Sequence, residues 1–218
     1  MFVGHYGVSY WVKSRDKRIP LWVLFLAVQI VDVFWAIFVL AGVEKVRIVP
    51  GITATNPLDL YYMPYTHSLL ATAVWFGVGF AAYRWAGAAR WENGRAALWV
   101  AVAVASHWVL DLIVHRADLP LYDDAMKVGL GLWNLPAPAF LLEAALALGG
   151  IALYMRATSG ATALARFGMP VFGVVMLAVQ ASVFFGPPPP SPEAIAVTAL
   201  VSYFAFAAIA GWLDRKRT

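Results

Sequence analysis

The sequence predicts an all-α integral membrane protein with six transmembrane helices and an N-terminal half-helix, re-entrant or interfacial, all within one domain spanning residues 1–218. Of the 218 residues, 62% are apolar and 13% are charged, whereas soluble domains are nearer half apolar and a quarter charged. A helix needs roughly 20 apolar residues to cross a hydrocarbon core. Six segments meet that requirement: 19–41, 67–86, 96–115, 135–154, 167–185 and 192–213.

The first twelve residues, MFVGHYGVSYWV, are apolar but too short to span. Apolar runs of this length are usually interfacial or re-entrant, so we expect a half-helix packed on the bundle and turned at residues 13–18. The basic cluster KSRDKR follows the apolar run instead of preceding it, which argues against a signal peptide. Pro20 then opens the first crossing.

The connections between the later crossings also carry turn signals. The long connection 42–65 contains Pro50-Gly51 and Asn56-Pro57 turns, and loops of such length are often functional. We therefore expect it to fold over a site as a lid. Four consecutive prolines, 187–190, predict a stiff turn before the last crossing. We find no internal repeat and no second domain.

The distribution of basic residues predicts the orientation in the membrane. Six crossings place both termini on one side, and twelve of the sixteen Lys and Arg residues fall on that side. Cytoplasmic loops carry the excess of basic residues, so both termini are predicted to be cytoplasmic. The placement of the basic residues, more than the net charge of +4, reports orientation, and we expect no nucleic acid among the partners.

Five of the six crossings carry a polar residue at a similar depth. With a rise of 1.5 Å per residue, these residues lie between about 18 and 25 Å above the basic residues that mark their cytoplasmic ends. An ionisable side chain in hydrocarbon costs at least about 2.5 kcal/mol, so we expect them to meet inside the bundle. They are Asp32, His67, His107 with Asp111, Glu143 and Gln180.

The segment SHWVLDLIVHR, residues 106–116, places His107, Asp111 and His115 at spacings of four, so the three fall on one helical face. The chain has no cysteine, so any metal must take nitrogen and oxygen ligands. Such ligands suit a divalent ion, zinc first, with iron or manganese as alternatives. The candidate ligands are His5, Asp32, His67, His107, Asp111 and His115.

Two further residues are candidates for catalysis. A metal ion can polarise a carbonyl or phosphoryl oxygen and lower the pKa of a bound water to about 7. Glu143, buried by the depth count, is the candidate proton acceptor. Arg116, near the outer surface, is the candidate for holding a phosphate.

At these positions the sequence resembles the inner-membrane metal-dependent hydrolase-like family, the LexA-regulated, DUF457-type proteins. The family pattern is GH, then LPDxD, then HRGxTHS, then SHxxxD and a VPLL-like stretch. The corresponding residues here are Gly4-His5, Asp32, Thr66-His67-Ser68, Ser106-His107 with Asp111, and Leu119-Pro120-Leu121. The match covers roughly the first 120 residues. The resemblance implies metal binding in a bacterial-type inner membrane and a hydrolase activity.

Two positions depart from the family pattern. Phe34 stands where the second aspartate would be, and Tyr62 stands where the first histidine would be. His115 is present where the pattern has no histidine, so it is a candidate replacement for one of them. The chain therefore resembles a divergent branch of the family.

We expect metal-dependent hydrolysis of a lipid-like or amphipathic ester or phosphoester reached from the outer face, with membrane lipid as the partner. A small transporter or proton pathway through the same layer is the alternative, and a metal-stabilised scaffold without chemistry is a third. Several of these residues also have an alternative interpretation in which they only stabilise the structure. His107 and Asp111 can fasten helices together, His115 and Arg116 can cap a helix, and His5 can be interfacial.

Overall fold

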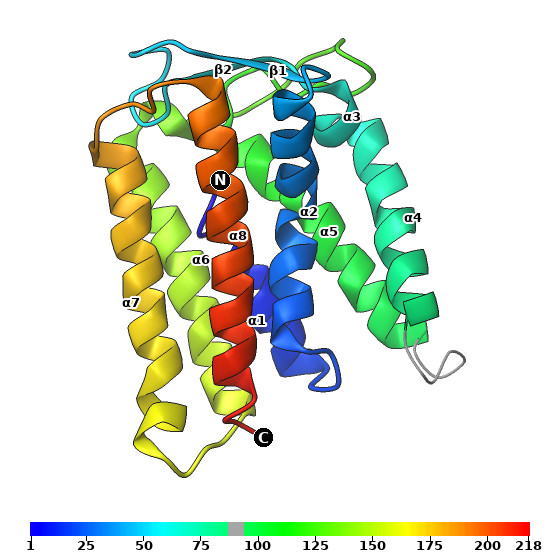
Figure 1. Cartoon of the computed structure of the whole chain (residues 1–218), viewed down its shortest axis with the longest axis vertical. Helices are drawn as coiled ribbons and strands as arrows, with labels where there is room; N and C mark the ends of the chain where they lie inside the picture. The colour runs from blue at the N-terminus through cyan, green and yellow to red at the C-terminus, as the bar shows by residue number, and fades with distance from the viewer. Residues whose placement is uncertain (87–93) are drawn as a thin grey trace.

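The computed structural model describes residues 1–86 and 94–218, which form a helical bundle with a small hairpin across one end (Figure 1). The described residues contain eight α-helices, one 3-10 helix and two strands. In chain order these are α1 (His5–Arg15), α2 (Leu21–Leu40), β1 (Lys45–Ile48), β2 (Leu58–Tyr62), α3 (Pro64–His67), α4 (Leu69–Ala86), α5 (Gly94–Val114), η1 (Leu132–Asn134), α6 (Pro136–Ala157), α7 (Ala163–Phe185) and α8 (Pro192–Asp214).

Among the described residues, five helices are long and apolar enough to cross a membrane: α2, α5, α6, α7 and α8. These are the helices of a multi-pass membrane protein. The predicted segment 67–86 corresponds to α4, which is not among the five. It has 18 residues, and Arg84 together with its aromatic neighbours lowers its hydropathy. Arg90, one of the basic residues that predicted the orientation, lies outside the described residues.

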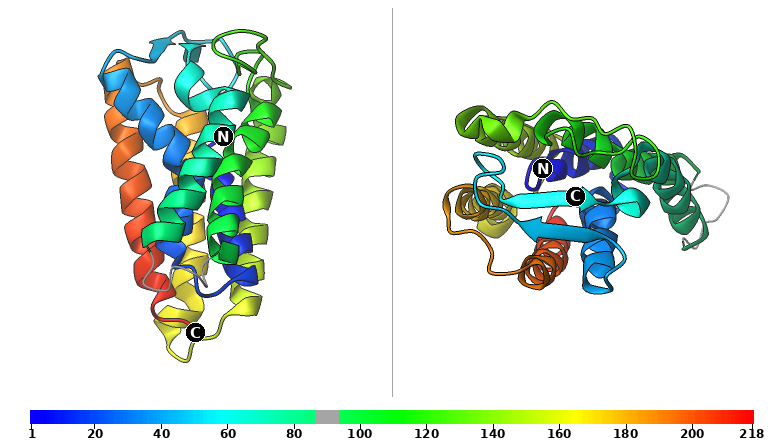
Figure 2. Two further views of the ribbon diagram at one scale, coloured as in Figure 1. Left: turned by 90° about the vertical axis from the view of Figure 1, so that its right-hand side faces the viewer. Right: turned by 90° about the horizontal axis from the view of Figure 1, so that it is seen from above.

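The predicted N-terminal half-helix is present as α1, which lies against α6, α2 and α5 (Figures 1 and 2). Its contact with α6 is close, because a Cβ at Gly150 would lie 2.6 Å from the carbonyl oxygen of Gly7. The turn at its end is closed by Lys13, whose Nζ donates 2.9 Å hydrogen bonds to the carbonyls of Lys17 and Ile19. α1 therefore runs from the middle of the bundle to one end.

The hairpin of β1 and β2 departs from the all-α prediction. The strands pair antiparallel, with Ile48 opposite Leu58 and Arg47 opposite Asp59, and they lie across the end of the bundle (Figure 2). Strands of four and five residues are too short for their alternation to stand out in a sequence of this composition. We call this end the hairpin end. The opposite end, with the turn 16–20 and the C-terminus, is the basic end.

The buried core consists of two apolar clusters with a polar layer between them. Along α2, Phe25, Val28 and Val31 belong to the first cluster, and Trp35 and Ala36 belong to the second. Asp32 lies at the boundary between them. The same happens along α5, where His107 and Asp111 separate Val104 from Val114. The polar residues predicted to share one depth thus lie between two blocks of packed apolar side chains.

Candidate metal centre

Six ionisable side chains meet in the polar layer, and all four histidines of the chain are among them. We call this set the histidine–carboxylate cluster. All six side chains are at most 14% exposed. The members are His5, Asp32, His67, His107, Asp111 and His115.

Asp111 lies at the centre of the cluster. Its Oδ2 is 3.1 Å from Nε2 of His107 and 3.5 Å from Nε2 of His115. Both histidines are one helical turn from Asp111, as their spacing of four predicted. α5 ends at Val114 and His115 follows it, with a backbone hydrogen bond from its amide to the carbonyl of Asp111. α5 and the residue after it thus supply three members from one face.

Asp32 on α2 and His67 at the end of α3 add a second carboxylate and a third histidine. Nε2 of His67 lies 3.2 Å from Oδ1 of Asp32 and 3.7 Å from Oδ2 of Asp111. Oδ1 of Asp32 is also 3.5 Å from Nε2 of His107. Tyr203 on α8 donates a 3.0 Å hydrogen bond to the other oxygen of Asp32, which fixes the orientation of that carboxylate.

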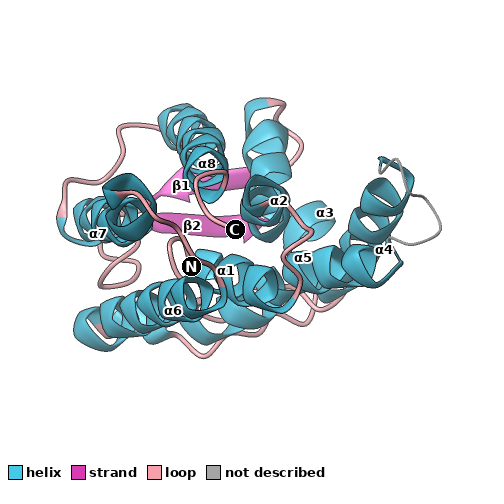
Figure 3. Cartoon of the chain, turned by 90° about the horizontal axis from the view of Figure 1, so that it is seen from below, coloured by secondary structure: helices cyan, strands magenta, loops and turns pink. Residues whose placement is uncertain are grey.

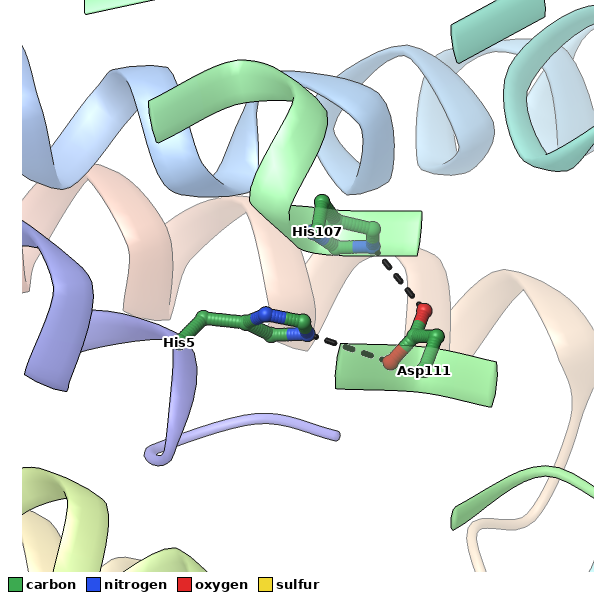
Figure 4. Close-up of side chains that lie close together, drawn as sticks. All are labelled: His5, His107 and Asp111. Atoms are coloured by element: carbon green, nitrogen blue, oxygen red, sulfur yellow. Dashed lines mark hydrogen bonds and ion pairs between the residues drawn. The ribbon is translucent and has the colours of Figure 1, made fainter. Parts of the chain in front are cut away.

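His5 reaches the cluster from the start of α1. Its ring stacks on that of His107, with centroids 4.1 Å apart and planes 7° apart, and its Nε2 lies 3.1 Å from Oδ1 of Asp111 (Figure 4). The amino group of Met1 also lies 2.6 Å from this oxygen. Asp111 thus faces three histidines through Oδ2 and His5 through Oδ1.

Three of the histidines are oriented through their second ring nitrogen. Nδ1 of His107 lies 2.7 Å from the carbonyl oxygen of Val28. A carbonyl oxygen only accepts, so Nδ1 donates to it, and Nε2 points toward the carboxylates. Nδ1 of His115 lies 2.8 Å from Oδ1 of Asp118, and Nδ1 of His67 lies 2.7 Å from Oγ1 of Thr66. Partners of this kind typically orient metal-binding histidines.

The three side chains of the motif Thr66-His67-Ser68 have different roles. Thr66 contacts His67 and donates a 2.6 Å hydrogen bond to Oε2 of Glu44. Ser68 adopts an extended backbone conformation between α3 and α4, and its Oγ accepts from the amide of Ala71. Ser68 thus caps α4, while Thr66 orients His67.

Glu44 was missed by the sequence analysis. Its Oε1 accepts from the amides of Tyr65 and Thr66, and it is 1% exposed. Burial raises the pKa of the Glu44 carboxyl above its usual value, and His67 and the hydrogen bonds from Thr66 and Tyr65 oppose that rise. Asp118 was missed in the same way. Both residues lie in connections, where no helical depth count could place them beside a histidine.

The distances within the cluster fit a shared coordination shell. Two ligand atoms that bind one tetrahedral zinc ion, each roughly 2.0–2.1 Å from it, lie about 3.3 Å apart. The five separations between imidazole Nε2 atoms and carboxylate oxygens around Asp32 and Asp111 fall between 3.1 and 3.7 Å. Two groups have ligand atoms within 4.8 Å of one another: His5, His107 and Asp111, and Asp32, His67 and His107. These buried groups could hold a metal ion.

Two nitrogen atoms of the cluster make no well-aligned hydrogen bond, although Nε2 of His107 lies 3.1 Å from Oδ2 of Asp111. Among the described residues, Nε2 of His107 and Nδ1 of His5 are buried without a hydrogen bond. Leaving a buried polar atom unsatisfied costs about 1–3 kcal/mol. Coordination of an ion by Nε2 of His107 would offset that cost, so the donor set fits a divalent metal.

The two catalytic candidates have other contacts. Glu143 is fully buried, and its Oε2 accepts from the amides of Phe2 and Gly4 while its Oε1 accepts from Gln180. Its carboxylate therefore anchors the segment before α1 and so helps to position His5, the first residue of α1. Arg116 donates to Asp59, which also binds Arg47 of β1. Arg116 is thus part of the hairpin's ion pairs.

A cavity of about 250 Å³ adjoins the histidine–carboxylate cluster. Asp32, His67, Asp111 and His115 form part of its wall. The hairpin connection covers it as expected of a lid, because Thr55, Asn56, Leu58 and Leu60 also line it. Thr55 fastens that connection through two hydrogen bonds to the carbonyl of Trp133, whose ring lies 4.3 Å from His115.

Comparisons with protein-family models, with curated proteins and with solved structures found no match to this chain. The predicted family membership therefore stays a prediction.

Proposed function

We propose that the histidine–carboxylate cluster binds a divalent metal ion, zinc in the first instance, and that the chain uses it to hydrolyse a lipid-like or amphipathic ester or phosphoester. The observation that carries the proposal is the convergence of four imidazoles on two carboxylates beside a cavity. Structural polar pairs inside membranes need no such cavity.

The chain's own residues have distinct parts in this proposal. His67, His107, Asp32 and Asp111 would hold the ion, and His5 contacts the second oxygen of Asp111. A bound divalent ion polarises a carbonyl or phosphoryl oxygen and acidifies a bound water. The largely apolar cavity wall limits the access of bulk water, and a low local dielectric strengthens each of these electrostatic interactions.

Proton transfer needs a group with a free lone pair near the substrate. Glu143 lines the cavity, but its oxygens already accept three hydrogen bonds. We assign Glu143 the positioning of His5. His115 lines the cavity, with its Nε2 3.5 Å from Oδ2 of Asp111 and its Nδ1 2.8 Å from Oδ1 of Asp118. This imidazole is the member of the cluster best placed to exchange a proton with the cavity.

The proposal includes a location and a family. We place the chain in a bacterial-type inner membrane with both termini cytoplasmic and with α4 as a sixth crossing. The excess of basic residues at the basic end supports this orientation, which puts the cluster in the outer half of the membrane. The motifs around His5, Asp32, His67 and His107 support membership of the DUF457-type hydrolase-like family.

Phospholipid turnover in detergent micelles tests the proposal. The purified protein, loaded with zinc, is compared with a variant in which Asp32, His67, His107 and Asp111 are all changed to alanine. We expect the natural chain to release product at least about 100-fold faster, as expected when a metal centre is removed. Equal release by the two proteins, with matching size-exclusion profiles, would contradict hydrolysis at this centre.

A further inference from the structure

The cavity beside the histidine–carboxylate cluster opens sideways between α7 and α8. Ser182 and Val183 of α7 and Thr198 of α8 line it, and all three side chains are also exposed on the outside of the protein. Val183 is 48% exposed. Residues that border both a cavity and the exterior mark its mouth.

The connection between the two helices explains why they part here. α8 packs mainly against α2 and makes few contacts with α7 (Figure 3). Four consecutive prolines join α7 to α8 at the hairpin end (Figure 1). A polyproline II segment of four residues spans about 12 Å, more than the roughly 8–10 Å between the axes of packed helices. The connection is thus long enough to leave the two helix ends apart.

The mouth continues to the hairpin end. A second hollow shares Ser182, Val183 and Thr198 with the first, and it reaches the proline run and residues 50–58 of the hairpin connection. The opening therefore extends along α7 and α8 from the level of the cluster to the end of the bundle. A molecule lying in it would contact both the membrane interior and its surface.

The surface on either side of the mouth is apolar. Phe185 of α7, one turn from Ser182, is 66% exposed, and Val197 and Val201 of α8, which neighbour Thr198, are 50% and 64% exposed. Both helices are candidate membrane spans. Apolar side chains exposed on such helices face lipid, so the mouth faces hydrocarbon.

The deep wall of the cavity carries large aromatic rings beside the cluster. Trp35, Phe184 and Tyr203 line it and are between 5% and 9% exposed. The volume of about 250 Å³ is below the ~300–1,000 Å³ of pockets that enclose a drug-sized ligand. The cavity therefore suits part of a long molecule whose remainder lies outside.

We propose that a membrane lipid enters the cavity sideways through the mouth between α7 and α8, with its polar head group toward the histidine–carboxylate cluster and an acyl chain extending past Val183 and Thr198 into the membrane. The identification of this lipid as a substrate rests on the proposed function. The binding of this lipid does not rest on the proposed function, because the shape and polarity of the cavity alone support it.

Photolabelling with a lipid tests this route. Phosphatidylglycerol with a photoactivatable diazirine close to its head group, on the first carbons of one acyl chain, is added to the protein in nanodiscs and irradiated, and the labelled residues are mapped by mass spectrometry. We expect label on Trp35 and Tyr203, which are 5% and 7% exposed and which lipid around the protein does not reach. The exposed residue Phe185, at the end of α7, serves as an internal standard for that surrounding lipid.

Two variants of α8 make the test specific. Ala199→Trp places a large ring in the cavity wall beside the mouth. Val201→Trp is the matched control, because two residues along a helix turn a side chain by about 200°. We expect Ala199→Trp to lower the labelling of Trp35 and Tyr203 at least fivefold and Val201→Trp to leave it unchanged. The metal content of both variants should equal that of the natural chain.

The outcomes separate this inference from the proposed function. Interior labelling that is lost in Ala199→Trp supports lateral access even when no lipid is hydrolysed. Absence of interior labelling, or equal labelling in Ala199→Trp and Val201→Trp, overturns lateral access even when lipid is hydrolysed.

Discussion

Two polar clusters lie at opposite levels of the bundle, and only one of them is complete. The basic-end cluster consists of Lys13, Tyr154 and Asp214. Lys13 Nζ lies 2.9 Å from Oδ2 of Asp214, and Tyr154 donates a 3.0 Å hydrogen bond to its Oδ1. The remaining donors of Lys13 bind two backbone carbonyls. Each charge has an opposite partner, which is the pattern of a structural fastening between helices.

The histidine–carboxylate cluster differs in how its polar atoms are paired and in what lies beside it. Four imidazoles surround two carboxylates, two of its nitrogens have no hydrogen bond among the described residues, and a cavity adjoins it. A cluster that only stabilised the fold would satisfy its polar atoms internally. The comparison indicates that a ligand completes this cluster, while the basic-end cluster is complete in itself.

The largest expected difference between the two clusters is their contribution to metal affinity. Asp111→Asn removes the charge of the carboxylate that contacts all four histidines but keeps its shape. We expect zinc affinity to fall by at least about 100-fold, since ligands matter more than the outer partners whose loss costs 10–100-fold. Competition with a zinc-binding dye in detergent measures it. Asp214→Asn is the control, and comparable loss in both variants would remove the distinction between the clusters.

The next effect is on stability at the basic end. Asp214→Asn leaves Lys13, whose side chain is 9% exposed, without its charged partner. We expect the free energy of unfolding to fall by up to about 3 kcal/mol, as for other broken buried pairs. Thermal unfolding in detergent measures this. Asp124→Asn, which breaks the half-exposed pair with Lys127, should cost under about 1 kcal/mol. A smaller loss at Asp214 than at Asp124 would contradict the structural role.

A smaller effect concerns the orientation of one ligand. Thr66→Val removes the hydroxyl between His67 and Glu44 without changing the size of the side chain. We expect zinc affinity to fall about 10–100-fold, the usual cost of losing an outer partner. Thr72→Val is the matched control, because Thr72 is also buried and donates only to the carbonyl of Ser68. Unchanged affinity in Thr66→Val would show that His67 needs no such orientation.

Much of the bundle followed from the sequence because hydrocarbon imposes helix length and apolar composition together. The structure's α2, α5, α6, α7 and α8 correspond to five of the six predicted segments, with ends that differ by a few residues. The hairpin did not follow, because its pairing depends on a turn and on ion pairs such as Arg47 with Asp59. These contacts produce no regular spacing of apolar residues in the sequence.

The depth count predicted which residues share a level but could not predict which way they face. Glu143 and Gln180 lie in the predicted layer, yet they bind the backbone of the segment before α1. His5, the first residue of α1 directly after that segment, was added by its motif and joins the cluster. A rise per residue gives height along a helix, whereas the rotation of each helix about its axis depends on packing against its neighbours.

The most direct test of the account is the metal content of the detergent-purified protein, measured by elemental mass spectrometry beside His107→Ala, Asp32→Ala and Lys13→Ala. We expect about one or two equivalents of zinc, iron or manganese in the natural chain. We also expect their loss from the first two variants and their retention in Lys13→Ala. A natural chain that carries no metal and takes up none on titration would contradict the metal centre.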